Sequence, residues 1–363
     1  MLIESIGYFL PTKEVSTDQV VKDCKKKVWI PLEKITGIKS RRKAGDTEFS
    51  VDLAIRAAQQ CLDNSKYDVK DIDLVLCCNI SRMDAKDMVT FEPSTAIKLV
   101  QHFGFENAMA FDISNACAGF FTGLKTAQNY LDTGVAKRVL VVSGEYITHL
   151  TDVAQKEIKG FRDERMPCLT LGDSGVAAIL ENSDDPNVGF HDIDMFTYGE
   201  YSELCTAGPT EEQHGHPGCI MYTKFNDLVE RTIPVCIDHS LNTVKSKGWE
   251  LNQFDQMIMH QISSQTIKLV KSKLNDHCGT EMFHDKNTIS NLERRGNTSS
   301  TTHFVAIMDN VLNGRIKSGD KILFSINASG ITVGTALYTF DDLPDRLRTK
   351  MAKKSEVKTE VTA

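Results

Sequence analysis

Residues 72–80 (IDLVLCCNI) and residues 254–262 (FDQMIMHQI) align as two copies of one pattern. The first copy is a continuous apolar run, which is typical of a strand that is covered on both faces of its sheet. Farther along, residues 117–134 and residues 297–314 have equal length, and both carry a helical pattern. Two blocks that recur in the same order predict a duplicated α/β unit.

Length and composition fit this duplication. The chain has 363 residues, of which 41% are hydrophobic and 25% are charged, an ordinary globular composition. It is about twice as long as a typical domain of ~100–200 residues. We therefore expect an N-terminal half over residues 1–182, a C-terminal half over residues 183–345 and a polar, flexible tail over residues 346–363. The stretch 183–222 is expected to be rich in loops.

Charge and cysteine usage exclude several classes of protein. The net charge is −7, which argues against a nucleic-acid-binding protein. No apolar run approaches the ~20 residues of a membrane span, and no secretory signal is apparent. Ten cysteines without a Cys-x-x-Cys pair predict free thiols and a cytoplasmic location. His214, His216 and Cys219 form an H-x-H-x-x-C pattern without a further ligand pair nearby, so we predict no metal.

The duplication brings three side chains toward one point. Equivalent positions of two pseudo-symmetric halves meet near the axis that relates them, so Cys117, His260 and Asn297 are expected to converge there. A helix N-terminus favours a cysteine thiolate, and a neutral histidine opposite it can donate to a thioester oxygen. Each residue also has a plainer interpretation, as a buried thiol, a core histidine or a helix-capping asparagine. The convergence favours a nucleophilic cysteine site.

Seven motifs resemble the thiolase superfamily, specifically its 3-oxoacyl-acyl-carrier-protein synthase III type. In chain order they are Thr36-Gly37-Ile38, Phe91 to Ala96, Asn115 to Phe120, Leu171-Gly172-Asp173, His260-Gln261, Gly296 to Ser299 and Gly330 to Gly334. The resemblance covers roughly residues 5–341. It implies an α/β, duplicated, five-layered αβαβα fold, a homodimer, and a catalytic triad of Cys117, His260 and Asn297.

The resemblance also implies a reaction. An acyl group passes from a CoA or acyl-carrier-protein thioester to Cys117, and a Claisen condensation with a second thioester follows, after decarboxylation or deprotonation. His260 and Asn297 would stabilise the enolate, and the backbone N–H groups of Cys117 and Ser329 would form the oxyanion hole. No cofactor is implied. The expected partners are acyl thioesters, an acyl carrier protein and a second copy of the chain.

Substrate contacts and carrier docking are further expectations. Phe91, Glu92 and Gly330 are the expected substrate-binding residues. Phe91 or Glu92 is expected to reach the partner subunit's pocket and there to limit the chain length or to act as a base. Two groups of cations are candidates for docking an acidic carrier protein, with a solvated surface as the plainer interpretation. They are Lys268, Lys271 and Lys273, and Lys156, Lys159, Arg162 and Arg165.

Several positions depart from the usual family motifs. The histidine motif reads His260-Gln261-Ile262-Ser263 and is followed by Gln265, and the C-terminal turn reads Ala328-Ser329-Gly330. Trp29 lies two residues farther from Gly37 than the adenine-stacking tryptophan of the initiating enzymes. These departures resemble the secondary-metabolite branch, and among its members the dialkylresorcinol-condensing enzymes are the best match.

Three alternatives to that branch stay open. The chain is also compatible with a fatty-acid-initiating synthase that joins a short acyl-CoA to malonyl-carrier protein. An acyltransferase that forms no carbon–carbon bond would begin with the same acyl-cysteine. A silent partner subunit of a ketosynthase pair is disfavoured, because such subunits generally lose the nucleophile and Cys117 is intact.

Overall fold

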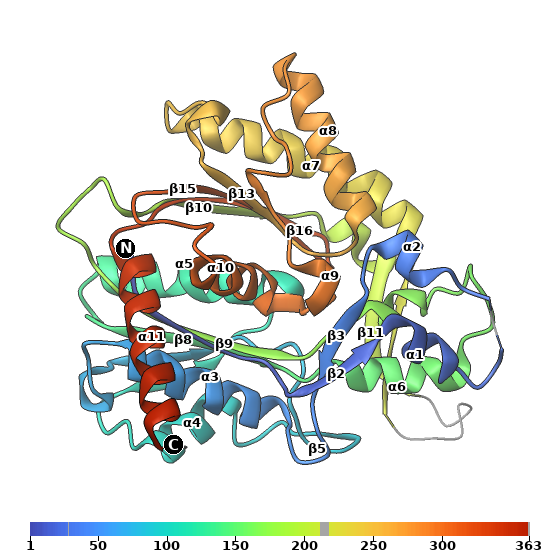
Figure 1. The fold of residues 1–363 in the computed structure, drawn as a ribbon, viewed down its shortest axis with the longest axis horizontal. Coiled ribbons are helices and arrows are strands. Elements are labelled where there is room, and N and C mark those ends of the chain that lie inside the picture. The colour runs from blue at the N-terminus through green and yellow to red at the C-terminus, as the bar shows by residue number, and fades with distance from the viewer. Residues whose placement is uncertain (28, 211–217, 362–363) are drawn as a thin grey trace.

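Two five-stranded mixed sheets of the same internal order form the framework of the molecule (Figure 1). The computed structural model describes residues 1–27, 29–210 and 218–361. The strands of the first sheet, in spatial order, are β1 (Leu2–Phe9), β9 (Ser174–Glu181), β8 (Val139–Glu145), β4 (Leu74–Cys77) and β7 (Met109–Asp112). Those of the second sheet are β10 (Gly189–Thr197), β16 (Thr332–Thr339), β15 (Lys321–Ala328), β13 (Gln256–Met259) and β14 (Thr288–Ile289).

The pairing directions repeat from one sheet to the other. In the first sheet β4 runs parallel to β7 and β8, and β9 runs antiparallel to β8 and β1. In the second sheet β13 runs parallel to β14 and β15, and β16 runs antiparallel to β15 and β10. The predicted duplication is therefore confirmed, with β4 and β13 as the two copies of the quoted apolar strand.

Two buried helices separate the sheets. They are α5 (Gly119–Asp132) and α10 (Thr302–Leu312), and their aromatic side chains meet, with 4.4 Å between the ring centroids of Phe120 and Phe304. Nearly every residue of α10 is buried, as expected for a helix that is covered on all sides. This shared core joins the two halves into one unit.

The outer faces of both sheets are covered by amphipathic helices, which completes the predicted αβαβα layering (Figure 1). The first sheet is covered by α3 (Ser50–Asn64) and α4 (Thr95–Phe103), and the second by α7 (Phe225–Ser246) and α8 (Ser264–Cys278). The buried stripe of α3 consists of small residues at helical spacing, so this helix lies very close to its sheet.

This close approach predicts a strong effect at Gly7. A Cβ atom at Gly7 of β1 would lie 2.2 Å from the backbone nitrogen of Cys61 and 2.3 Å from the carbonyl oxygen of Ala57, both in α3. We expect Gly7→Ala to lower the free energy of unfolding by roughly 1–3 kcal/mol. The clashing atoms belong to the backbone of α3, and they cannot move aside as the end of a side chain can. Gly208→Ala is the matched control, since a Cβ atom there meets nothing within 4 Å. Thermal unfolding of both variants measures the difference, and equal stabilities would contradict the expectation.

Shorter elements lie beside and between the layers (Figure 1). The remaining strands are β2 (Lys13–Ser16), β3 (Ser40–Lys43), β5 (Met83–Ala85), β6 (Met88–Val89), β11 (Cys205–Pro209) and β12 (Cys219–Thr223). The remaining α-helices are α1 (Thr17–Lys22), α2 (Leu32–Thr36), α6 (Thr148–Glu157), α9 (Leu292–Arg295) and α11 (Leu343–Val361). The 3₁₀ helices are η1 (Val69–Asp71), η2 (Ala116–Ala118), η3 (Met166–Thr170), η4 (Gly199–Leu204), η6 (Leu251–Gln253) and η7 (Ser299–Thr301). None of the described helices is long and apolar enough to cross a bilayer.

Two stretches contain more regular structure than the sequence pattern indicates. The stretch 183–222, expected to be rich in loops, also contains β10, β11 and most of β12. The edge strand β10 buries only part of its length, so polar residues interrupt its apolar pattern. The flexible tail expected from residue 346 instead continues α11, because Leu347 is buried in the core and Arg346 donates to the Glu4 carbonyl oxygen at 3.0 Å.

Candidate active site

Cys117 lies in the 3₁₀ turn that leads directly into α5. The preceding residue, Ala116, has a φ of +43°, a left-handed conformation that side chains rarely adopt and that turns the chain sharply before the thiol. The thiol is half-buried, and its Sγ lies 3.5 Å from Ser299 Oγ. Burial raises the pKa of the Cys117 thiol to about 12, while the Ser299 contact lowers it. Burial therefore opposes the stabilisation of the thiolate that is expected at a helix N-terminus.

Ser299 links Cys117 to Asn297. The Ser299 backbone N–H donates to Asn297 Oδ1 at 2.9 Å, which leaves the Asn297 Nδ2 amide group to face other partners. The backbone of Asn297 is held from both sides, since its N–H donates to Thr170 O and its carbonyl oxygen accepts from Gly172 N, each at 3.0 Å. Asn297 was expected to open its helix, but it precedes the 3₁₀ turn η7 that leads into α10.

His260 follows β13 directly and is buried. Its backbone N–H donates to Ser325 O at 3.2 Å, and its ring stacks on the His303 ring with 5.9 Å between centroids. His303 also packs edge-on against Phe121, with 5.1 Å between the ring centroids. Phe121 lies about one helical turn after Cys117. His260 thus reaches the cysteine helix through His303. Burial, with a smaller contribution from His303, lowers the pKa of His260 to about 3.

A pH titration tests the state of His260. Because its folded-state pKa is far below the ordinary value, the imidazole is expected to stay uncharged across neutral and mildly acidic pH. The unfolded chain takes up this proton near pH 6.5, so burial of the ring makes the fold less stable as pH falls below about that value. The NMR shift of the His260 Cε1–H group is expected to stay constant between about pH 5 and 8. An inflection near pH 6.5 would contradict this.

The turn between β15 and β16 lies against the cysteine loop. Thr332 Oγ1 donates to Asn115 Oδ1 at 3.3 Å, so the turn that contains Ser329 and Gly330 lies near Cys117. Gly330 has a φ of +126°, and a Cβ atom added there would meet nothing closer than 3.8 Å. Glycine therefore allows both the backbone conformation and an open approach at this turn.

Glu145 is a buried acid beside the site that sequence reasoning missed. It ends β8, and its Oε1 accepts hydrogen bonds from the hydroxyls of Ser143 and Ser300 and from the backbone N–H of Ile80. Burial raises the pKa of Glu145 to about 7, and its negative charge contributes to the raised pKa of Cys117. The signal was present in the sequence, because a lone carboxylate ends the apolar strand RVLVVSGE.

A pocket of about 730 Å³ adjoins these residues. Its wall includes Thr170, which binds the backbone of Asn297, and Ile262 and Ser263, which follow His260. Phe161, Arg162, Lys224 and Phe225 line the remainder, together with Leu32 and Ile35 of α2. The lining is mixed, because the acids Asp163, Glu164 and Asp227 lie in it beside Arg162 and Lys224. Its volume is in the range of pockets that bind small ligands.

Comparison with known proteins identifies the family of this site. The model for 3-oxoacyl-[acyl-carrier-protein] synthase III matches residues 111–199, and the model for the C-terminal part of that enzyme matches residues 244–340. A β-ketoacyl-[acyl-carrier-protein] synthase III of Sulfurimonas denitrificans is 30% identical over 348 residues, covering 93% of this chain and 98% of the relative. The chain belongs to the 3-oxoacyl-acyl-carrier-protein synthase III family. It is a thiolase-fold acyltransferase of the condensing-enzyme type.

Other relatives and solved structures agree with this family. The synthase III of Rickettsia bellii is 30% identical over 335 residues, which cover 91% of this chain and 96% of the relative. The synthase III structure of Aquifex aeolicus has a TM-score of 0.79 at 24% identity, covering 93% of this chain and 99% of that chain. A structure of a Xanthomonas campestris OleA variant has the same TM-score, 0.79, at 21% identity, covering 93% of this chain and 98% of that chain. These two structures show the shared fold.

Several predicted site residues of this family member lie apart from the cysteine. Phe91 and Glu92 are exposed at the end of the β5–β6 segment, and Phe91 is 77% exposed. On α8, Lys268 and Lys273 are exposed, whereas Lys271 pairs with Asp285 at 2.5 Å.

The second cation group divides in the same way. Lys156, Lys159 and Arg162 are exposed, but Arg165 is buried and bonds both Asp163 and Glu157 at 2.7 Å. Arg165 is therefore neutralised within the fold, and the prediction that it belongs to a free cationic surface is wrong.

The sequence contains one pattern that resembles a metal-binding motif. His214 and His216 of the H-x-H-x-x-C pattern lie outside the described residues. Within the described ranges, no three His, Cys, Asp or Glu side chains gather as a metal site.

Proposed function

We propose that this enzyme joins two acyl chains, forming a carbon–carbon bond between an acyl group on Cys117 and the α-carbon of a second thioester. The observation that carries the proposal is the linkage Cys117–Ser299–Asn297, which brings a thiol and an oriented carboxamide together. Thr170, which binds the backbone of Asn297, also lines the pocket of about 730 Å³. A condensing enzyme needs a nucleophile and donors for a developing oxyanion at one place.

In the first half-reaction, Cys117 attacks the carbonyl carbon of an acyl-CoA or acyl-carrier-protein thioester. Because burial keeps the free thiol protonated, the sulfur must lose its proton as it attacks. The uncharged imidazole of His260 is the proposed acceptor of that proton, directly or through one water. The backbone N–H groups of Cys117 and Ser329 are the proposed donors to the tetrahedral oxyanion, and the carrier thiol leaves with the proton.

In the second half-reaction, the other thioester becomes a carbon nucleophile by loss of CO₂ or of an α-proton. The enolate oxygen accepts hydrogen bonds from His260 and from Asn297 Nδ2, which the bond between Asn297 Oδ1 and the Ser299 N–H leaves available. The enolate carbon then attacks the acyl-Cys117 carbonyl, and the C–S bond breaks to release the Cys117 thiolate. After loss of CO₂ the thiolate takes a proton from water, and after deprotonation it takes the α-proton from the base that removed it.

The finer part of the proposal concerns the substrates. We propose a secondary-metabolite role in which both chains are long or β-keto acyl groups, as in dialkylresorcinol- and cyclohexanedione-condensing enzymes. Two observations support it: the departures in the histidine motif and the C-terminal turn, and the position of Trp29, which is 85% exposed and does not line the pocket of about 730 Å³. Among the similar structures, OleA of Xanthomonas campestris has been crystallised with bound lauric acid and lauroyl-CoA.

Acyl thioesters of graded length test this substrate class. The protein is incubated with acetyl-, octanoyl- and lauroyl-CoA and with the matching carrier-protein thioesters, and the peptide that contains Cys117 is analysed by mass spectrometry. We expect the long chains to label Cys117 at least ~10-fold faster than acetyl, since each buried methylene favours binding. Labelling by acetyl-CoA alone would overturn the proposal in favour of the fatty-acid-initiating synthase, the second candidate, which the names of the curated relatives favour.

We also propose a homodimer and a carrier-docking surface. The edge strand β7, where Met109 is 48% exposed, leaves unpaired backbone groups for a second copy. In that dimer, Phe91 and the base Glu92 would reach the pocket of the partner subunit. Lys268 and Lys273 are the proposed contacts for an acidic carrier protein.

A further inference from the structure

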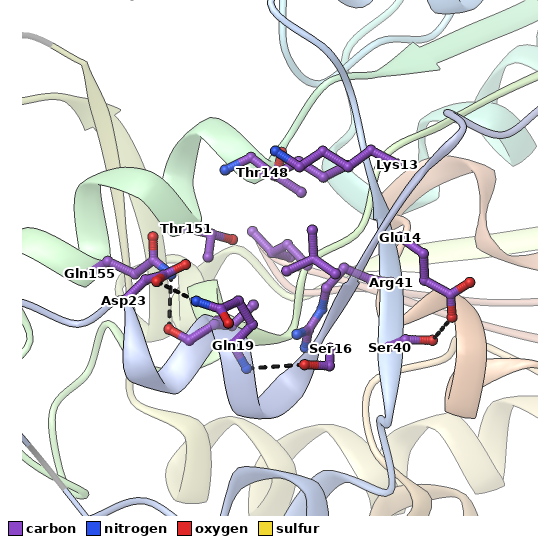
Figure 2. A pocket seen from close by; sticks show the side chains of 14 residues that line it. Lys13, Glu14, Ser16, Gln19, Asp23, Ser40, Arg41, Thr148, Thr151 and Gln155 are labelled. Carbon is purple, nitrogen blue, oxygen red and sulfur yellow. Dashed lines mark hydrogen bonds between the residues drawn. The ribbon is translucent and has the colours of Figure 1, made fainter.

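A separate polar pocket of about 650 Å³ lies beside the ribbon that β2 and β3 form. Figure 2 shows its side chains, which come from that ribbon, from the helices α1 and α6, and from Asp23 and Leu171 outside these elements. Among the described residues, none lines both this pocket and the pocket of about 730 Å³ at Thr170 and Ser263. The reaction proposed above makes no use of it.

Arg41 is the unusual member of this lining. Its side chain is only 1% exposed and runs from β3 toward Ser16 and Gln19 (Figure 2). Arg41 Nη2 donates to Leu169 O at 3.0 Å, but Nε and Nη1 have no hydrogen-bond partner in the part of the chain that the structure describes. Burial lowers the pKa of Arg41 to about 10, and no acid in the described ranges offsets that burial. Buried cations are normally paired, because an unpaired charge is costly away from water.

The surroundings of Arg41 define the ligand that would pair with it. Lys13 also lines the pocket and forms no ion pair among the described residues, whereas Lys43 pairs with Asp152. Glu14 and Asp23 line the pocket too, so a doubly charged anion is disfavoured. The apolar members of the lining are Val15, Val20 and Leu171. A singly charged group with a short apolar part fits this combination.

We propose that this pocket binds a small organic monocarboxylate whose carboxylate pairs with Arg41. The unpartnered nitrogens of Arg41 are shielded from solvent, so the ligand reaches them after the Gln19 side chain swings aside. That movement costs little free energy, because Gln19 is exposed and, within the described ranges, its side chain bonds only Asp23, at 2.7 Å.

The pocket is connected to the active site through the segment that Arg41 holds. Arg41 bonds Leu169 O, and the next residue, Thr170, accepts the backbone N–H of Asn297 at 3.0 Å. Gly172 donates to the carbonyl oxygen of Asn297, and a Cβ atom on Gly172 would lie 3.1 Å from Arg41 Cβ. A carboxylate that repositions Arg41 therefore shifts the segment that fixes Asn297, so binding alters the rate of condensation.

NMR of the full-length protein tests the binding directly. The Nε–Hε signal of Arg41, assigned by its loss in Arg41→Met, is followed while sodium butyrate, sodium phosphate or sodium chloride is added at equal ionic strength. We expect a saturable shift with butyrate alone. Gln19→Trp fills the pocket without touching the active site and is expected to weaken butyrate binding about 30-fold or more. Asp18→Trp, on the neighbouring position of α1, is the matched control and is expected to bind as the wild type does.

Four results would overturn parts of this proposal. Identical shifts with butyrate and chloride, or unchanged binding in Gln19→Trp, would overturn the site and assign the pocket to water. Tighter binding of phosphate than of butyrate would overturn the assignment to a carboxylate. A condensation rate that butyrate changes in the wild type but not in Gln19→Trp supports the link to Asn297, and an unchanged wild-type rate overturns that link. Binding is measured without turnover, so failure of the proposed reaction would be seen separately.

Discussion

Cys117→Ala is expected to lower the rate of product formation at least ~10⁴-fold, because it removes the only atom to which the acyl group is proposed to attach. The substitution deletes one sulfur from a half-buried position and leaves the left-handed turn at Ala116 in place. The fold is therefore expected to remain, which thermal unfolding checks.

Cys205→Ala is the matched control for that experiment. Its thiol is also half-buried and lies close enough to interact with Cys117, so it is a nearby thiol with a different predicted role. We expect Cys205→Ala to keep acyl labelling of the Cys117 peptide. Unchanged product formation by Cys117→Ala would favour the silent-partner interpretation, and loss of labelling in Cys205→Ala alone would assign the nucleophile to Cys205.

His260→Ala is expected to lower the condensation rate by ~10²–10⁴-fold. The proposed role of His260 is to accept the thiol proton and to donate to the enolate oxygen, and an uncharged ring is able to do both in turn. The rate of condensation is expected to fall more than the rate of acylation. The enolate carries a full negative charge, and the variant lacks one of the two hydrogen-bond donors that stabilise it. Single-turnover measurements separate the two steps.

His239→Gln is the control for general effects of removing a histidine. His239 lies on the outer helix α7 and bonds Thr335 at 2.9 Å, away from the cysteine turn. We expect that variant to retain nearly full activity. An acylation rate and a condensation rate that both stay unchanged in His260→Ala would contradict the proposed role and leave His260 as a core residue.

The duplicated framework could be predicted because short sequence patterns indicate its strands and helices. The strand β4 is a continuous apolar run, β13 has three apolar residues after Gln256, and equal intervals from Cys117 and from Asn297 mark the two central helices. Burial on both faces imposes such patterns, so they survive in a single sequence. Where burial is partial, as in β10, the pattern fades and the strand was missed.

The sequence names candidate members of the site, but it does not predict their electrostatics. A helix terminus suggests a stabilised thiolate, yet burial dominates and raises the pKa of Cys117. The availability of a cation depends likewise on partners that lie far away in sequence. Arg165 is neutralised by Glu157 and Asp163, and Lys271 by Asp285, whereas Arg41 is buried without an acid among the described residues. The sequence shows which residues are charged, but the fold determines which of them form ion pairs.

Carbon-13 NMR of the product tests most directly the central claim that this enzyme forms a carbon–carbon bond through Cys117. The protein is acylated with a long-chain thioester labelled at its carbonyl carbon and is then given a second thioester labelled at its α-carbon. We predict that the label leaves Cys117 and that the product shows one-bond carbon–carbon coupling between the two labelled atoms. Release of the first label as a free acid or as a new thioester, without that coupling, would contradict the claim.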